Sequence, residues 1–238
     1  MIMKNRFGAM LAGILALCCS QASAGIMGLQ AARLEIEASH GHADAFSTLR
    51  RAAESGDPIA QSALGLYYGG KQDYAKAVYW FQKAAVQGNA DAEYNLGVLY
   101  DDGQGVPLDY AKAVYWYRKA AAQGLAVAES NLGRFYGTGQ GTPRDDVKSV
   151  YWYRRAANQG DTNAELNLGL AYATGQGVPT DYVVAYKWLV IAKAYAKPGI
   201  RQYRQADQAI GLLLQEMTTA QIAQAQAEAA AWVKTHSP

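Results

Sequence analysis

Hydrophobic positions recur along this chain with one long period, from residue 64 to residue 188. A Leu-Gly pair occurs at residues 64–65, 96–97, 132–133 and 168–169, and a tyrosine follows each glycine by three residues. Four tryptophans, Trp80, Trp116, Trp152 and Trp188, lie 36 residues apart. Periods of this length are typical of repeat proteins, in which each unit buries its apolar face only against its neighbours. The pattern therefore predicts a stacked array of similar units.

The hydrophobic spacing inside one unit predicts two helices. In the second unit Ala92, Leu96 and Tyr100 lie four apart on one stripe, and Gly97 beside them allows a neighbouring helix to approach closely. A second helix is predicted by apolar residues at i, i+3, i+4, i+7 and i+8: Ala113, Trp116, Tyr117, Ala120 and Ala121. The rings could form a carbohydrate or cofactor platform, but one register in every unit favours core spacers.

Glycine-rich segments separate these helices. The segment Gly103-Gln104-Gly105-Val106-Pro107 recurs at residues 139–143 and 175–179, and the first unit lacks it. Its glycines permit positive φ, Pro107 prevents helix continuation and Asp109 can cap the next helix. Gln-Gly closes three units, with Gly124 as an expected left-handed helix end. A phosphate loop is disfavoured because the segment follows a helix, lacks a Lys-Ser/Thr ending and occurs three times.

The combined pattern Ala-x-x-x-Leu-Gly-x-x-Tyr, Gly-x-Gly-x-Pro, Ala-x-x-Trp-Tyr and Ala-Ala-x-x-Gly resembles the Sel-one-like repeat, a relative of the tetratricopeptide hairpin. The resemblance implies an all-α fold, an α/α superhelical solenoid of about four 36-residue helical hairpins with helical caps at both ends. The expected units are residues 56–87, 88–123, 124–159 and 160–195.

Both ends of the array depart from the repeat, as expected of units that cover an open core. Residues 25–55 are predicted to hold a cap helix over 29–39 and a degenerate half repeat, in which Thr48 replaces the tryptophan. Residues 196–238 are predicted to form a C-terminal helical cap. One of its helices contains Ile210, Leu212, Leu213, Leu214 and Met217. A capping box at Thr218-x-x-Gln221 opens the other, whose apolar face carries Ile222, Ala225, Ala229, Trp232 and Val233.

The first residues predict export. Lys4 and Arg6 precede an apolar stretch over 9–17 and then Ala22-Ser23-Ala24, the order of a secretory signal peptide cleaved after residue 24. A membrane anchor is disfavoured because the apolar stretch is far shorter than the roughly 20 residues that a spanning helix needs. A lipoprotein is the lesser alternative because Leu17 beside Cys18 is bulky. We therefore expect a bacterial protein that is periplasmic or secreted.

Removal of that segment changes the composition. Both cysteines lie within it, and loss of Lys4 and Arg6 leaves 20 of the 22 basic residues against 20 acidic ones. The mature chain would contain no disulfide and would be nearly neutral, which argues against a nucleic-acid surface and a polybasic membrane patch. We expect no cofactor, and a monomer.

The resemblance to tetratricopeptide arrays implies a binding surface on the concave side, formed by the first helices. The expected solvent-facing positions lie two residues before and two after each Leu of Leu-Gly, with others at the rim. They are Ser62, Leu66, Tyr94, Val98, Asp101, Asp102, Ser130, Arg134, Thr138, Leu166 and Leu170. These positions vary between units while the core positions do not. A specific binding groove requires such variation, but a surface that is only solvated would vary equally.

No pattern of residues predicts catalysis. The three histidines, His40, His42 and His236, all lie outside the repeats, and a mature chain offers no thiol to pair with them. His40-x-His42 with Asp44 nearby could supply metal ligands, but two histidines on an unpatterned segment favour a solvated loop. Adjacent acids such as Asp101 and Asp102 usually face water.

Three functions remain as hypotheses. The first is an exported scaffold or adaptor that binds a protein partner along its concave face, as the family resemblance implies. The second is an inhibitor or immunity protein that neutralises a toxic effector enzyme. The third is a β-lactam-binding or hydrolysing enzyme, by likeness to cysteine-rich family members. It is disfavoured because the mature chain would contain no cysteine.

Overall fold

The computed structural model describes residues 24–236, and these form twelve α-helices and no strand. The all-α solenoid class expected from the repeats is thereby confirmed. The predicted signal peptide lies outside the described residues except for Ala24. The described residues divide into two compact units, residues 24–120 and 121–236.

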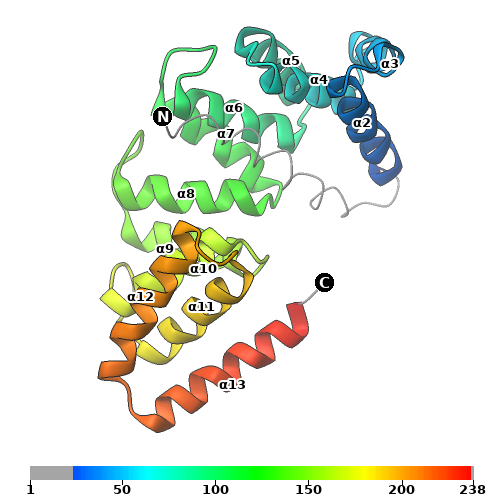
Figure 1. Cartoon of the computed structure of the whole chain (residues 1–238). Coiled ribbons are helices and arrows are strands. Elements are labelled where there is room, and N and C mark those ends of the chain that lie inside the picture. Colours follow the sequence, from blue (N-terminus) through cyan, green and yellow to red (C-terminus); the bar gives the residue numbers. More distant parts are fainter. Residues whose placement is uncertain (1–23, 237–238) are drawn as a thin grey trace. The chain divides into compact units, whose positions relative to one another are not determined.

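Unit 1 begins with the N-terminal cap. Helices α2 (Ala24–Ser39) and α3 (Ala43–Glu54) pack on each other and on α4 (Pro58–Gly70) (Figure 1). The first repeat pairs α4 with α5 (Tyr74–Val86), and α5 packs on α6 (Ala90–Asp102). Helix α7 (Tyr110–Ala122) crosses the boundary between the units near its end. The cap helix begins five residues earlier than the predicted 29–39.

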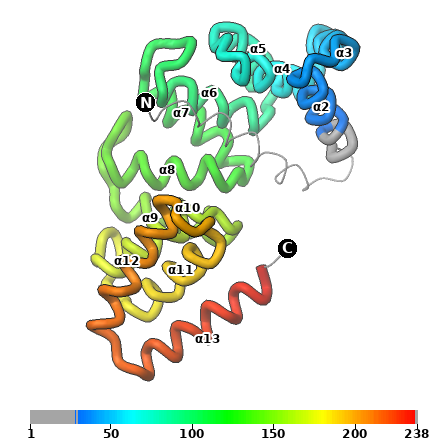
Figure 2. The backbone as a smooth tube through the Cα atoms, in the orientation of Figure 1, coloured from blue at the N-terminus to red at the C-terminus, as the bar shows by residue number. Residues whose placement is uncertain are grey.

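Unit 2 contains two hairpins and the C-terminal cap. Helix α8 (Ala126–Thr138) packs on α9 (Asp146–Ala157), and α10 (Thr162–Thr174) packs on α11 (Tyr182–Tyr195). In the cap, α12 (Arg201–Glu216) contacts α10 and α11, whereas α13 (Thr219–His236) packs on α11. Figure 2 shows that α12 and α13 diverge from the turn that joins them.

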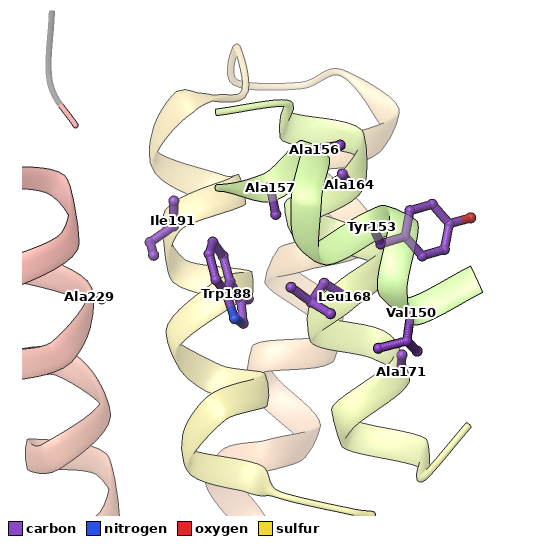
Figure 3. Packing of buried hydrophobic residues seen from close by; sticks show 10 residues of the cluster. All are labelled: Val150, Tyr153, Ala156, Ala157, Ala164, Leu168, Ala171, Trp188, Ile191 and Ala229. Atoms are coloured by element: carbon purple, nitrogen blue, oxygen red, sulfur yellow. The ribbon is translucent and has the colours of Figure 1, made fainter. Parts of the chain in front are cut away.

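Small and large residues alternate in the core of unit 2. Ala156, Ala157 and Ala164 are almost fully buried where α9 meets α10, and Trp188 and Ile191 of α11 fill the space beside Leu168 (Figure 3). Ala229 brings α13 onto the same cluster. The alanines allow close helix approach, and the rings and branched side chains fill the remaining volume, which is how stacked hairpins reach interior packing density.

The helix ends follow the sequence signals. The Asp109 carboxylate accepts from the Lys112 amide at 2.9 Å, as expected of a cap. Thr218 and Gln221 exchange hydrogen bonds, the Thr218 amide donating to Oε1 at 2.8 Å and the Gln221 amide to the Thr218 hydroxyl at 3.3 Å. This is the predicted capping box.

The tryptophans only partly fill the role expected of them. Trp80 and Trp188 are buried, but Trp116 and Trp152 are half-buried. The residue after each tryptophan is buried in every repeat: Phe81, Tyr117, Tyr153 and Leu189. Each of these lies against the glycine of the Leu-Gly pair in its own repeat. The position after the tryptophan is therefore the central packing position of the repeat.

Candidate functional site

The Leu-Gly register determines which side of each first helix is free. In α6 both Leu96 and Gly97 are buried, and a Cβ at Gly97 would lie 2.6 Å from Cε1 of Tyr117. That side of α6 is occupied by the second helix of its own hairpin. Tyr94, whose ring contacts Tyr117, and Val98 are only half-buried on α6. The first helix thus presents a partly exposed surface held by a rigid core.

Unit 1 carries the apolar and acidic part of the predicted binding set. Leu66, Tyr94 and Val98 are half-buried, and the Tyr94 ring lies tilted against Tyr117 with centroids 5.7 Å apart. Asp101 and Asp102 are half-buried at the C-terminal end of α6. The surface is therefore an aromatic and aliphatic patch with carboxylates at one end.

Unit 2 carries the basic part of the predicted binding set. The Arg134 guanidinium lies 4.2 Å from the centroid of the Phe135 ring, a cation–π contact that orders the cation on α8. The exposed Thr138 hydroxyl donates to the Arg134 carbonyl at 2.9 Å, and Leu170 on α10 is half-buried. Seven residues of the predicted set are thus half-buried and one is exposed.

The expectation of solvent exposure is wrong at three positions: Ser62, Ser130 and Leu166 are buried. Leu166 lies in a cluster with Ala206 and Ile210, because the cap helix α12 covers this position of the fourth repeat. Ser130 is hydrogen-bonded to Asp161, the N-cap of α10, and is therefore part of the packing between successive first helices. Ser62 belongs to α4, which packs against α2, α3 and α5.

A row of buried carboxyl groups was not predicted. Glu93, Glu129 and Glu165 lie 36 residues apart near the start of α6, α8 and α10, and all are buried. Lys119 Nζ lies 2.8 Å from a Glu93 oxygen, and Arg155 Nη2 lies 2.7 Å from Glu129. These ion pairs join the two helices of a hairpin. The signal was present, because Glu93 and Glu129 are each followed 26 residues later by a cation, but charged residues are rarely buried.

Burial dominates the electrostatics of Glu129 and Glu165. Desolvation raises the pKa of Glu129, although the hydrogen bonds and charge of Arg155 and a hydrogen bond from Gln159 lower it. Burial, with the charge of Asp161 adding to it, raises the pKa of Glu165 to about 8. The charged form of a carboxyl loses its hydration on burial, so the neutral form is favoured.

A second unpredicted feature is a set of exposed tyrosines. Tyr79, Tyr115 and Tyr151 are 49%, 54% and 51% exposed, although they are large apolar side chains of the second helices. Each stacks edge-on against the following tryptophan, with centroids 5.0 or 5.1 Å apart. In the fourth repeat the position holds Lys187, whose Nζ lies 5.4 Å from the Trp188 ring centroid.

The histidines lie apart from the repeats. His40 Nδ1 lies 2.8 Å from the Ile36 carbonyl at the end of its own helix, and His42 precedes α3 as its N-cap. His236 stacks on Trp232 with ring centroids 4.2 Å apart. Within residues 24–236 no three His, Cys, Asp or Glu side chains gather in a way that could hold a metal ion. None of the helices described is long and apolar enough to span a membrane.

These features define a helical-hairpin repeat protein whose first helices carry the variable surface. The family model of the Sel1 repeat matches residues 58–89, 90–125, 126–161 and 162–194. The chain belongs to this family, and the resemblance inferred from the sequence is confirmed. All four matched units begin two residues after the boundaries expected from the sequence.

Solved structures support this assignment. A Sel1 repeat protein from Oxalobacter formigenes is 34% identical with a TM-score of 0.62, covering 71% of this chain and 49% of that one. A protective antigen of uropathogenic Escherichia coli with an SLR fold is 28% identical with a TM-score of 0.55, covering 83% and 50%. A Sel1 repeat protein from Klebsiella pneumoniae is 30% identical with a TM-score of 0.51, covering 80% and 90%.

One curated relative shares a shorter stretch. The ERAD-associated E3 ubiquitin-protein ligase component HRD3B of Arabidopsis thaliana is 41% identical over 66 residues, which is 26% of this chain and 10% of that protein. The chain thus spans a tenth of this plant relative and about half of two of the solved structures. Sel1 repeat proteins generally mediate protein–protein interaction, and their fold is typically a non-enzymatic scaffold.

Proposed function

We propose that this protein is an exported scaffold that binds a partner protein through the first helices of its repeats. The carrying observation is the contrast within these helices. The Leu-Gly side is the same in each, whereas the partly exposed side carries Tyr94 and Val98 on α6, Arg134 and Thr138 on α8, and Leu170 on α10. A surface of variable side chains on a constant scaffold is suited to specific recognition.

The chemistry of these side chains supports a protein partner. Tyr and Arg are enriched at the energetic centres of protein interfaces, and Tyr94 and Arg134 are each held against a neighbouring ring. An ordered side chain loses less conformational entropy on binding than a free one. We therefore expect apolar anchors of the partner at Tyr94 and Val98, and an acidic group opposite Arg134.

Site-specific photo-crosslinking in cells tests the binding surface. A photoreactive amino acid is placed at Val98, which is half-buried on α6, and as a matched control at Val86, which is 82% exposed on α5. The proposal predicts one discrete adduct from position 98 and none from position 86. Equal adducts from both positions, or no adduct from position 98, would contradict it. A captured hydrolase that is inactive in the complex would identify an inhibitor rather than an adaptor.

Export is proposed from the order of Lys4, the apolar stretch 9–17 and Ala22-Ser23-Ala24. A periplasmic fraction should contain a chain that begins at Gly25, identified by mass spectrometry of its N-terminal peptide. Ala24→Asp places a charged group at the cleavage position and should leave the precursor uncleaved. A cytoplasmic chain that retains residue 4 would contradict export.

A further inference from the structure

The fourth repeat retains the buried glutamate but has lost both residues that satisfy it in the third. In the third repeat Glu129 accepts from Arg155 at 2.7 Å and from the Gln159 amide at 2.8 Å. The corresponding residues 26 and 30 positions after Glu165 are Ile191 and Tyr195. Glu165 is fully buried, and within the described part of the chain neither carboxyl oxygen has a hydrogen-bond partner.

No cation compensates for this loss among the residues described. The charge that acts on Glu165 is that of Asp161, the N-cap residue of α10 one turn earlier, and it is an acid. The cations of the neighbouring helices are engaged elsewhere: Arg155 with Glu129, Arg154 with the Tyr172 hydroxyl, Lys187 with Glu228, and Lys193 with Asp207. Arg201 and Arg204 of α12 are exposed. An isolated buried carboxylate is strongly disfavoured, so this group stays neutral while the site stays closed.

Glu165 also lies where the repeats meet the C-terminal cap. Two residues before it, Asn163 accepts a hydrogen bond from the Gln202 amide of α12 at 3.0 Å. The residue after it, Leu166, packs in one cluster with Ala206 and Ile210 of the same helix. Hydration of the carboxylate would therefore require α10 to separate from α11 or from the start of α12.

We propose that Glu165 is a proton-dependent latch, whose neutral carboxyl keeps α10 closed against α11 and α12 and whose ionisation opens this junction. The direction follows from linkage. Burial raises the pKa of Glu165 to about 8 in the closed state, whereas a hydrated carboxyl has an ordinary value near 4.5. Between these values the closed state holds a proton that the open state has released, so opening becomes about tenfold more favourable per pH unit.

Hydrogen–deuterium exchange of the intact protein measures this opening. After correction for the intrinsic pH dependence of exchange, amides of α10 and α12 should show an opening constant about a hundredfold larger at about pH 7.5 than at about pH 5.5. Glu165→Gln keeps the shape of the neutral side chain and cannot ionise, so the change should fall below about threefold. Glu216→Gln removes an exposed acid of α12 and should leave the hundredfold change intact.

Two results would overturn the proposal. One is wild-type opening that varies by less than about threefold over this range, and the other is a Glu165→Gln variant that keeps the wild-type pH dependence. A carbon-13 titration of the Glu165 carboxyl provides a readout that needs no variant. Its midpoint should lie near 8. A midpoint near the ordinary carboxyl value would contradict the proposal equally.

Discussion

Gly97 and Tyr117 are packed so closely that no side chain fits between them. A Cβ at position 97 would lie 2.6 Å from Cε1 and 2.7 Å from Cδ1 of the tyrosine ring. Tyr117 is 1% exposed and cannot swing away. The same relationship joins Gly65 to Phe81 and Gly133 to Tyr153. The contact between the glycine of the Leu-Gly pair and this ring therefore sets the separation of the two helices in these hairpins.

Gly97→Ala should destabilise the protein. The added methyl group forces the buried ring or the helix to move, which costs about 1–3 kcal/mol in well-packed cores even though alanine is the better helix former. Urea unfolding monitored by circular dichroism measures the change in the free energy of unfolding.

Gly211→Ala is the matched control. Gly211 lies within α12, and nothing lies within 4 Å of the added Cβ. The substitution should stabilise the protein by about 0.5–1 kcal/mol because alanine loses less backbone entropy than glycine in a helix. Destabilisation at both positions would show that the substitution itself is harmful, and would contradict the role assigned to the Tyr117 contact.

Arg155→Met should destabilise the protein by about 2 kcal/mol at neutral pH, because it leaves the buried Glu129 carboxyl without its cation. The figure is below the usual cost of breaking a buried pair because Arg155 is 45% exposed and Gln159 still donates to Glu129. Loss of the cation raises the pKa of Glu129 further, so the deficit should shrink as the pH falls and the carboxyl becomes neutral. Thermal unfolding at about pH 5 and about pH 8 compares the two conditions.

The exposed pair of Arg50 and Glu54 is the control for this change. Their side chains are 57% and 51% exposed, and surface pairs contribute about 0–1 kcal/mol. Arg50→Met should therefore alter stability little and without a marked pH dependence. If both arginine variants behave alike, the burial of Glu129 has no energetic consequence.

Glu165→Met should stabilise the protein by about 3 kcal/mol at about pH 8 and by much less at about pH 5. The acid has a raised pKa in the folded state, so wild-type stability falls as the pH rises from the ordinary carboxyl value to about 8. Methionine has a similar length and carries no charge, so the variant should lack this decline. Calorimetric melting curves at several pH values measure the difference. Parallel curves for the two proteins would be inconsistent with a neutral buried carboxyl.

Much of the fold could be predicted because it depends on local spacing. The Leu-Gly pairs, the Gly-x-Gly-x-Pro connectors and the Thr218 capping box each act within one hairpin or one turn, and all appear at the expected residues. The prediction that the tryptophans are the core rings was less accurate. Trp116 and Tyr117 are adjacent aromatic residues on one helix, and the sequence alone does not show which of them is buried. Which of the two faces the glycine depends on the rotation of the helix in its hairpin.

The surface was harder to predict because exposure depends on distant segments. Leu166 has the same position in its repeat as Tyr94, yet α12 covers it, and the repeat pattern contains no information about α12. Ser130 is buried because it hydrogen-bonds to Asp161, the N-cap of the first helix in the next repeat. The equivalent N-cap in the repeat of Ser130 itself is Leu125, which has no side-chain oxygen, so the repeat pattern does not predict this contact. The lack of hydrogen-bond partners at Glu165 becomes visible only by comparison with Glu129. The positions that supply partners to Glu129 are occupied on α11 by Ile191 and Tyr195, which lie far from Glu165 in the sequence.

The central claim is that the variable side of the first helices binds a partner protein. The most direct measurement is the affinity of the crosslinked partner, once purified, for the wild type and for a chain carrying Arg134→Glu and Asp101→Lys, determined by isothermal titration calorimetry. Arg201→Glu with Glu216→Lys, both exposed on α12, is the control with the same net charge. The account predicts at least about tenfold weaker binding for the first pair, or about 1.4 kcal/mol, and unchanged binding for the control. Wild-type affinity in the Arg134 and Asp101 variant would contradict it.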